Sequence, residues 1–112
     1  MYNFDNLKSI KSKKDKDTLD KFYPLFIEAT KLIEKFNSTN YQKSYIEDAI
    51  NKLLECSKMK PAESEVYAYL AYCMYVLEND NMAIQYIRKA LSLNSNNKIV
   101  LKIQEMLSGI ST

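Results

Sequence analysis

Two segments of the sequence, 34 residues apart, carry the same order of small and large side chains. The positions correspond one to one: Ala49, Leu53, Cys56 and Pro61 return as Ala83, Ile87, Ala90 and Ser95. Small residues let two helices approach closely, and the large residue fills the groove between them. Because stacked helix pairs repeat at a fixed period, this pattern predicts a chain built from helix pairs.

The scarcity of turn-forming residues also favours helices. The chain has a single Gly and two Pro among 112 residues. An all-β fold would need a turn residue about every ten positions, often glycine. With 46% hydrophobic residues, a chain of this length can bury the core of one domain. We therefore expect one all-α domain.

Apolar residues that recur every three or four positions predict a first helix from near Thr18. Pro24 lies within this pattern, and the helix either kinks or starts there. Ser44 and Glu47 have the spacing of a capping box, which predicts the start of a second helix. That helix should end before Pro61, because the residue before a proline disfavours helical backbone angles.

Three further helices are predicted at residues 64–77, 80–93 and 98–107. The runs between them are rich in Asn, Asp and Ser, which is typical of loops. The last helix is expected to end before Gly109, because glycine commonly follows a helix C-terminus.

Residues 1–16 differ from the rest, because they show no sustained hydrophobic period and are rich in Lys and Asp. We predict a flexible Lys-rich arm over residues 1–16 and a helical domain over residues 17–112. Sixteen basic and fourteen acidic residues give a formal charge of +2, too small for a general nucleic-acid binder. A helical protein that binds nucleic acid through the arm stays a weaker alternative.

Membrane-spanning and signal segments are not evident in the sequence. No stretch approaches the roughly 20 apolar residues of a membrane span, and the N-terminus lacks the apolar core of a signal peptide. We therefore expect a cytoplasmic protein. Cys56 and Cys73 lie in apolar helical patterns without CxxC spacing, so both are expected to be reduced core residues.

From Tyr67 onward, the chain resembles the tetratricopeptide repeat (TPR) family, whose signature is W-x2-L-G-x2-Y followed by A-x3-F and P. Eight positions agree in size and spacing: Tyr67, Leu70, Ala71, Met74, Ala83, Ile87, Ala90 and Ser95. Tyr67 replaces the usual Trp, Ser95 replaces the final Pro, and the turn Gly is replaced around Glu78 and Asn79. The small residue of the first helix is also a departure, because it is Ala71 where the signature has Gly.

The resemblance implies an all-α, TPR-like α-solenoid fragment. It would hold about two helix-turn-helix repeats, at 18–61 and 62–95, and a C-terminal capping helix at 98–108. In the first repeat only the second helix fits the strict spacing, so the loop between its two helices would carry about seven extra residues.

In TPR proteins the first helix of each pair lines a concave surface that grips a partner, and the resemblance implies the same here. The implied contact residues are Glu65, Ala68, Tyr69, Tyr72, Tyr75 and Val76 in the second repeat, with Lys31 and Lys35 across the groove. Tyrosine suits such a surface because it offers a large area, few rotatable bonds and an orienting hydroxyl. The same tyrosines could instead pack on the preceding helix or on the arm.

These inferences predict a non-enzymatic interaction module, an adaptor, scaffold or chaperone-like protein, that holds a peptide or amphipathic helix in a Tyr-rich groove. The alternative is a self-associating structural module that forms a homodimer through the same face. The chain has no His, no Gly-rich phosphate loop and no nucleophile motif, so we expect no enzymatic activity, no cofactor and no metal.

Overall fold

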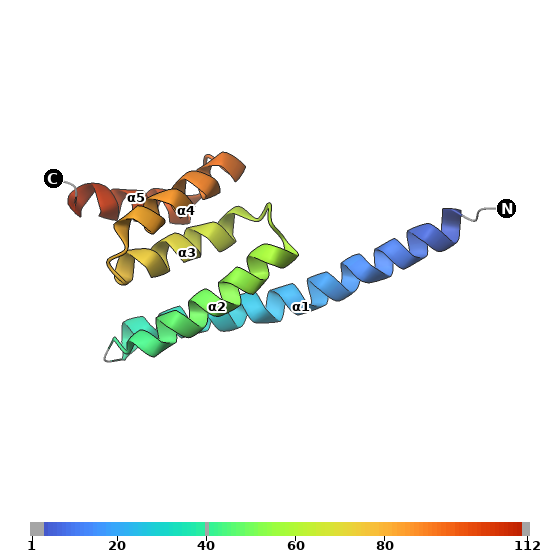
Figure 1. The fold of residues 1–112 in the computed structure, drawn as a ribbon, viewed down its shortest axis with the longest axis horizontal. Coiled ribbons are helices and arrows are strands. Elements are labelled where there is room, and N and C mark those ends of the chain that lie inside the picture. Colours follow the sequence, from blue (N-terminus) through green and yellow to red (C-terminus); the bar gives the residue numbers. More distant parts are fainter. Residues whose placement is uncertain (1–3, 40, 111–112) are drawn as a thin grey trace.

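The computed structural model describes residues 4–39 and 41–110, with side chains described for 21–39 and 41–106. Within these ranges the chain forms five helices and no strand (Figure 1). The helices are α1 (Phe4–Ser38), α2 (Lys43–Met59), α3 (Ser64–Val76), α4 (Asp80–Leu93) and α5 (Lys98–Ile110). The all-α class is confirmed, and the arrangement of the helices as a solenoid of two repeats stays a prediction.

Helix α1 begins earlier than the sequence predicts. It starts at Phe4, not near Thr18, and Pro24 lies inside it, so this proline does not start the helix. The backbone of the expected arm thus belongs to α1 from Phe4 onward. Residues 1–3 of the expected arm, and the side chains of all its residues 1–16, lie outside the described part of the chain.

The predicted capping box at Ser44 is wrong, because α2 begins before it. Gln42 is the N-cap residue and makes no side-chain cap hydrogen bond. The preceding Tyr41 has a positive φ of 52°, which turns the chain into the helix two residues early. At the other end of the chain, α5 continues through Gly109 to Ile110. Glycine within a helix costs only about 1 kcal/mol relative to alanine, which does not by itself end a helix.

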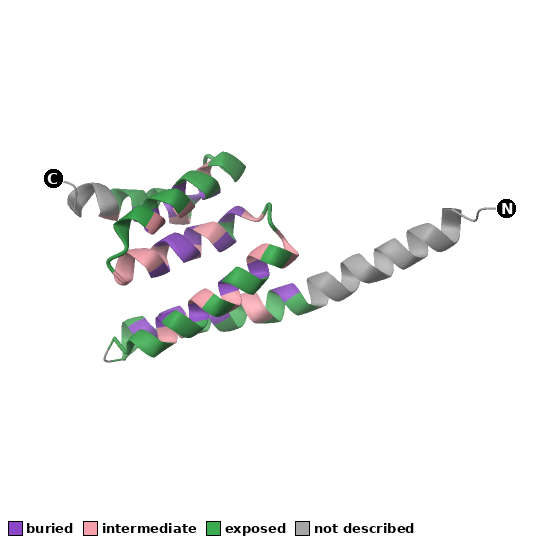
Figure 2. Cartoon of the chain, viewed as in Figure 1, coloured by how far each residue is buried: buried purple, intermediate pink, exposed green. Residues whose placement is uncertain are grey.

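Helix α3 lies at the centre of the fold and contacts each of the other four helices. Its apolar residues cover every side, and such a helix must be enclosed by its neighbours. Figure 2 shows α3 with buried or half-buried residues along its length, whereas α2 and α4 also show exposed faces. Its bounds match the predicted helix to within one residue.

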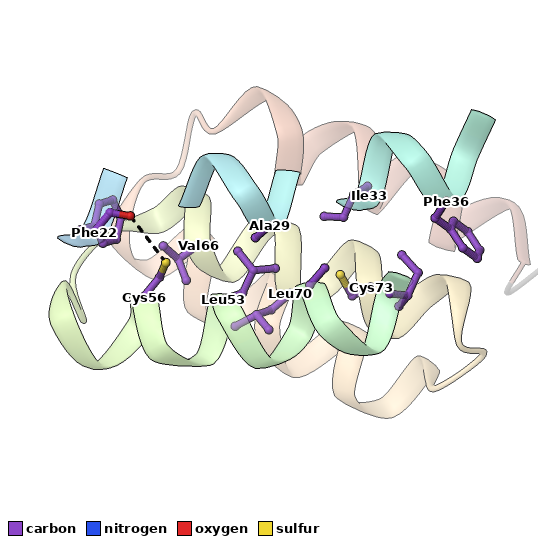
Figure 3. Close-up of a cluster of buried hydrophobic side chains, with 11 residues drawn as sticks. Phe22, Ala29, Ile33, Phe36, Leu53, Cys56, Val66, Leu70 and Cys73 are labelled. Carbon is purple, nitrogen blue, oxygen red and sulfur yellow. Dashed lines mark hydrogen bonds between the residues drawn. The ribbon is translucent and has the colours of Figure 1, made fainter. Parts of the chain in front are cut away.

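Two clusters of buried side chains use different faces of α3. The first joins α1, α2 and α3 (Figure 3), and it includes Phe22, Ala29, Ile33, Ile46, Ala49, Leu53, Cys56, Val66, Leu70 and Cys73. The second joins α3, α4 and α5 and consists of Ala68, Ala71, Ile87, Ala90, Val100 and Ile103. The pattern that recurs after 34 residues places six of its positions in helices, and all six are buried, as close helix packing requires: Ala49, Leu53, Cys56, Ala83, Ile87 and Ala90.

Both cysteines have thiols whose pKa depends on burial. Burial raises the pKa of Cys73 to about 12, and burial together with the Glu55 carboxylate raises the pKa of Cys56 to about 11. The Cys56 thiol donates to the Phe22 carbonyl at 4.0 Å, drawn as the dashed line in Figure 3. Both thiols therefore stay protonated at neutral pH.

We expect the raised thiol pKa values to make the fold sensitive to alkali. Each thiol has a pKa near 9 in the unfolded chain and a higher pKa in the folded protein. Its contribution to the free energy of unfolding is complete below pH 9 and is lost as the pH rises toward the pKa in the folded protein. For Cys73, each pH unit between these two pKa values costs about 1.4 kcal/mol. Urea denaturation of the wild type and of the Cys56→Ala/Cys73→Ala variant, repeated from neutral pH to pH 11, measures how the free energy of unfolding falls with pH. The variant should lose less stability over this range, and equal losses would contradict the expectation.

Candidate functional site

A groove lies where α1, α3 and α5 meet, and we call it the central groove. It has a volume of about 330 Å³. Its lining residues are Thr30, Ile33, Glu34 and Asn37 from α1, Tyr69 and Tyr72 from α3, and Ile99, Lys102, Ile103 and Met106 from α5. Ile33 and Ile103 are buried, so they form an apolar floor, and Thr30, Glu34, Asn37 and Lys102 add polar groups to the sides.

A larger hollow, which we call the end hollow, adjoins the central groove at the C-terminal ends of α1 and α3. Its volume is about 870 Å³. It is lined by Phe36, Asn37, Tyr41, Lys43, Tyr72, Tyr75, Val76, Leu77, Glu78 and Asp80. Because Asn37 and Tyr72 line both spaces, the two form one continuous surface.

Tyr72 ties α3 to α1 at the junction of the two spaces. Its hydroxyl donates to the Asn37 Oδ1 at 2.9 Å. This bond holds the ring in one orientation without burying it fully, since Tyr72 is half-buried. The junction is therefore a fixed aromatic surface.

Tyr69 presents a free hydroxyl to the central groove. Its ring packs edge-on against Phe26, with the ring centroids 5.5 Å apart. The Tyr69 hydroxyl makes no hydrogen bond to any residue that the structure describes. Every buried polar side-chain atom in the described part of the chain has a hydrogen-bond partner, so a hydroxyl without one is not buried. The Tyr69 hydroxyl is therefore accessible from the groove. Burial raises the pKa of Tyr69, and the carboxylates of Glu65 and Glu34 raise it further. Two acidic side chains thus act on this ring.

The structure brings together four of the residues proposed from the sequence. Tyr69 and Tyr72 line the central groove, and Tyr72, Tyr75 and Val76 line the end hollow. Glu65 is exposed at the start of α3 and acts electrostatically on Tyr69. These residues belong to one surface of α3.

Ala68 does not belong to that surface. It is fully buried in the cluster between α3, α4 and α5, so it cannot contact a partner of this fold. The resemblance to the TPR family placed it in the groove, because Ala68 occupies a groove position of the TPR pattern. The position of α5, which no local pattern supplies, decides that the Ala68 side is core.

Lys31 and Lys35 also lie elsewhere. Both line a shallow pocket with Glu28, Leu32 and Lys52, on the side of α1 that faces α2. The Lys35 ammonium lies 5.1 Å from the centre of the Tyr45 ring on α2. The rotation of α1 about its axis therefore directs Thr30, Glu34 and Asn37 to the groove, and the two lysines away from it.

Sequence reasoning missed the contribution of α5, which it treated only as a capping helix. Ile99, Ile103 and Met106 form one wall of the central groove. Their spacing of four and three residues does place them on one helical face, and that signal was present in the sequence. That this face borders the groove follows only from the packing of α5 on α3.

A buried polar chain fixes the start of α5 against α3 and α4. Asn97 donates from Nδ2 to the Ser64 Oγ at 2.8 Å, and the Ser64 hydroxyl donates to the Ala90 carbonyl at 2.9 Å. The Asn97 Oδ1 accepts hydrogen bonds from the backbone N–H groups of Ile99 and Val100 at 3.0 and 3.2 Å. Both side chains are buried and each of their polar atoms has a hydrogen-bond partner, so they hold the α5 wall in place.

In the described part of the chain, no three side chains of the His, Cys, Asp or Glu type lie together as metal ligands would. Among the described residues, no helix is both long enough and apolar enough to cross a bilayer.

A family model, that of Regulator of microtubule dynamics protein 1-3, matches residues 24–111. The chain belongs to this family. The match covers α2, α3, α4, α5 and the part of α1 that borders the groove. No curated protein and no solved structure matches the chain.

The assignment to the TPR family is therefore wrong, because the matching family is a different one and no TPR model matches. The eight positions behind that assignment report residue size and spacing. Of these, Leu70, Ala71, Ala83, Ile87 and Ala90 are buried at helix contacts. Any closely packed helix hairpin requires small and large residues at such positions, so the pattern does not distinguish one helical family from another.

Proposed function

We propose that this protein is a non-enzymatic interaction module that holds a segment of another protein in the central groove and end hollow. The observation that carries the proposal is the row of Tyr69, Tyr72 and Tyr75 along a continuous concave surface. Ligand sites in proteins have volumes of about 300–1,000 Å³ and mainly apolar walls with a few polar groups, which describes both spaces.

The name of the family supports a role in the regulation of microtubules. We propose that the segment belongs to tubulin or to a protein that acts on microtubules, and that binding takes place in the cytoplasm. A peptide or an amphipathic helix suits the elongated surface, because its side chains can enter the apolar floor in sequence.

Replacing Tyr69 and Tyr72 together with alanine should reduce capture of the partner by about ten-fold or more, since each ten-fold step equals about 1.4 kcal/mol and aromatic hot spots exceed this. The tagged full chain is incubated with extract of its native cell, and tubulin and microtubule-associated proteins are quantified in the bound fraction. The variant should keep a melting temperature near that of wild type.

Tyr23→Ala is the matched control, because Tyr23 is 53% exposed and lines neither space. It should bind as wild type does. Tyr72→Phe, which keeps the ring but removes the bond to Asn37, should bind with only a modest loss. Equal capture by wild type and the double alanine variant would refute the proposed function.

A further inference from the structure

Acidic side chains from two helices flank Tyr69. Glu34 comes from α1 and lines the central groove, and Glu65 comes from the first turn of α3. Both carboxylates act on the Tyr69 hydroxyl. Neither forms an ion pair with a described residue, whereas Glu28 and Glu63 are paired with lysines at 3.4 and 3.3 Å.

The charge of this surface is opposite in sign to that of the whole chain. Together with Glu65, the linings of the two spaces hold four acidic and two basic side chains, a formal charge of −2: Glu34, Glu65, Glu78 and Asp80 against Lys43 and Lys102. The chain as a whole carries +2. A cationic segment would therefore be attracted to the combined surface of the two spaces in preference to the rest of the molecule, and at the central groove Glu34 and the adjacent Glu65 outnumber Lys102.

Among the described residues, three tyrosines outside the two spaces have a cation over the ring, and the three α3 tyrosines that line the spaces do not. Tyr23, Tyr45 and Tyr67 each have a lysine ammonium 5.1–5.8 Å from the ring centre. Among the described residues, no such cation lies over Tyr69, Tyr72 or Tyr75. A cation over a tyrosine ring is worth about 0.5–1 kcal/mol at exposed sites and more where water is excluded.

We propose that the central groove takes a segment with an apolar side chain over Ile33 and Ile103, and a neighbouring Lys or Arg side chain at Tyr69, beside Glu34 of the groove lining and Glu65 one helical turn before Tyr69 on α3. Arginine fits best, because its planar guanidinium stacks on aromatic rings and bonds to two carboxylates at once. This inference rests on the proposed function, and it names the chemistry of the segment that the groove accepts.

Selection from a library of random short peptides tests the inference. Three forms of the full chain are immobilised and exposed to the same library: the wild type, the Glu34→Gln/Glu65→Gln variant and the Tyr69→Ala/Tyr72→Ala variant. The wild type should enrich peptides with Arg or Lys beside an apolar residue. The glutamine variant should keep the apolar preference but lose the basic one, and it should bind the wild-type peptide about ten-fold more weakly, a loss of about 1.4 kcal/mol.

The control for net charge is Glu47→Gln/Asp48→Asn, which removes two exposed carboxylates from α2, outside both spaces. It should bind the selected peptide as wild type does. Affinity of the wild type should also fall as salt is added, which tests the charge contribution without any substitution.

Two results distinguish the two proposals. Peptides that depend on Tyr69 and Tyr72 but carry no basic residue, or carry acidic ones, would overturn the inference and leave the proposed function standing. A selection that yields no peptide dependent on these tyrosines would overturn both.

Discussion

Replacing Leu70 with alanine should lower the free energy of unfolding by about 2–5 kcal/mol, the usual cost of a large cavity in a packed core. Leu70 is fully buried in the cluster between α1, α2 and α3. It also lies on the helix that contacts all four others, so the surroundings have little freedom to collapse into the cavity. The loss should unfold the chain at markedly lower urea concentration.

Leu54→Ala is the control for this substitution, because Leu54 is 37% exposed on α2. The same atoms are removed, but water already reaches the side chain, so the loss should stay below about 1 kcal/mol. Urea denaturation followed by circular dichroism measures both variants. Similar losses for Leu54→Ala and Leu70→Ala would contradict the central position of α3.

Replacing Asn97 with alanine should cost about 1.5–5 kcal/mol, through two contributions. The α5 N-cap loses both of its side-chain hydrogen bonds, which is typically worth about 0.5–2 kcal/mol. The bond to Ser64 is lost inside the core, where an unmade hydrogen bond costs about 1–3 kcal/mol. Because α5 forms one wall of the central groove, peptide binding should weaken as well.

Asn79→Ala provides the comparison, since Asn79 caps α4 through one exposed hydrogen bond to the Met82 N–H at 3.3 Å. It should cost about 1 kcal/mol, as an ordinary N-cap does. Asn97→Asp keeps the cap acceptor and removes the donor to Ser64, so its stability should lie between those of the wild type and Asn97→Ala. If Asn97→Ala and Asn79→Ala cost the same, the buried chain does not stabilise α5 as we describe.

The fold was predictable wherever it depends on local pattern. The all-α class, the bounds of α3 and α4 and the burial of Ala49, Leu53 and Ile87 follow from helical periodicity and residue size. Helix starts were less predictable. Gln42 caps α2 without a side-chain bond, and a start of this kind leaves no signature in the sequence.

The candidate site was predictable only in part, because a groove depends on how helices are rotated against one another. The four residues Tyr69, Tyr72, Tyr75 and Val76 do lie together along the two spaces, since one face of α3 holds them, and their role in binding a partner stays a prediction. The sequence pattern misplaced Ala68, whose neighbour is α5. It also misplaced Lys31 and Lys35, because a hydrophobic stripe fixes which side of α1 is buried but not which neighbour borders each flank.

Methyl NMR of isoleucines gives the most direct test of the claim that the central groove is the binding surface. Ile33, Ile99 and Ile103 line the groove, whereas Ile84 is exposed on α4 and Ile46 is buried between helices. On addition of a peptide enriched by the wild type, we predict that the signals of the first three shift and those of Ile84 and Ile46 do not. Shifts centred on Ile84, with Ile33 and Ile103 unchanged, would contradict the account.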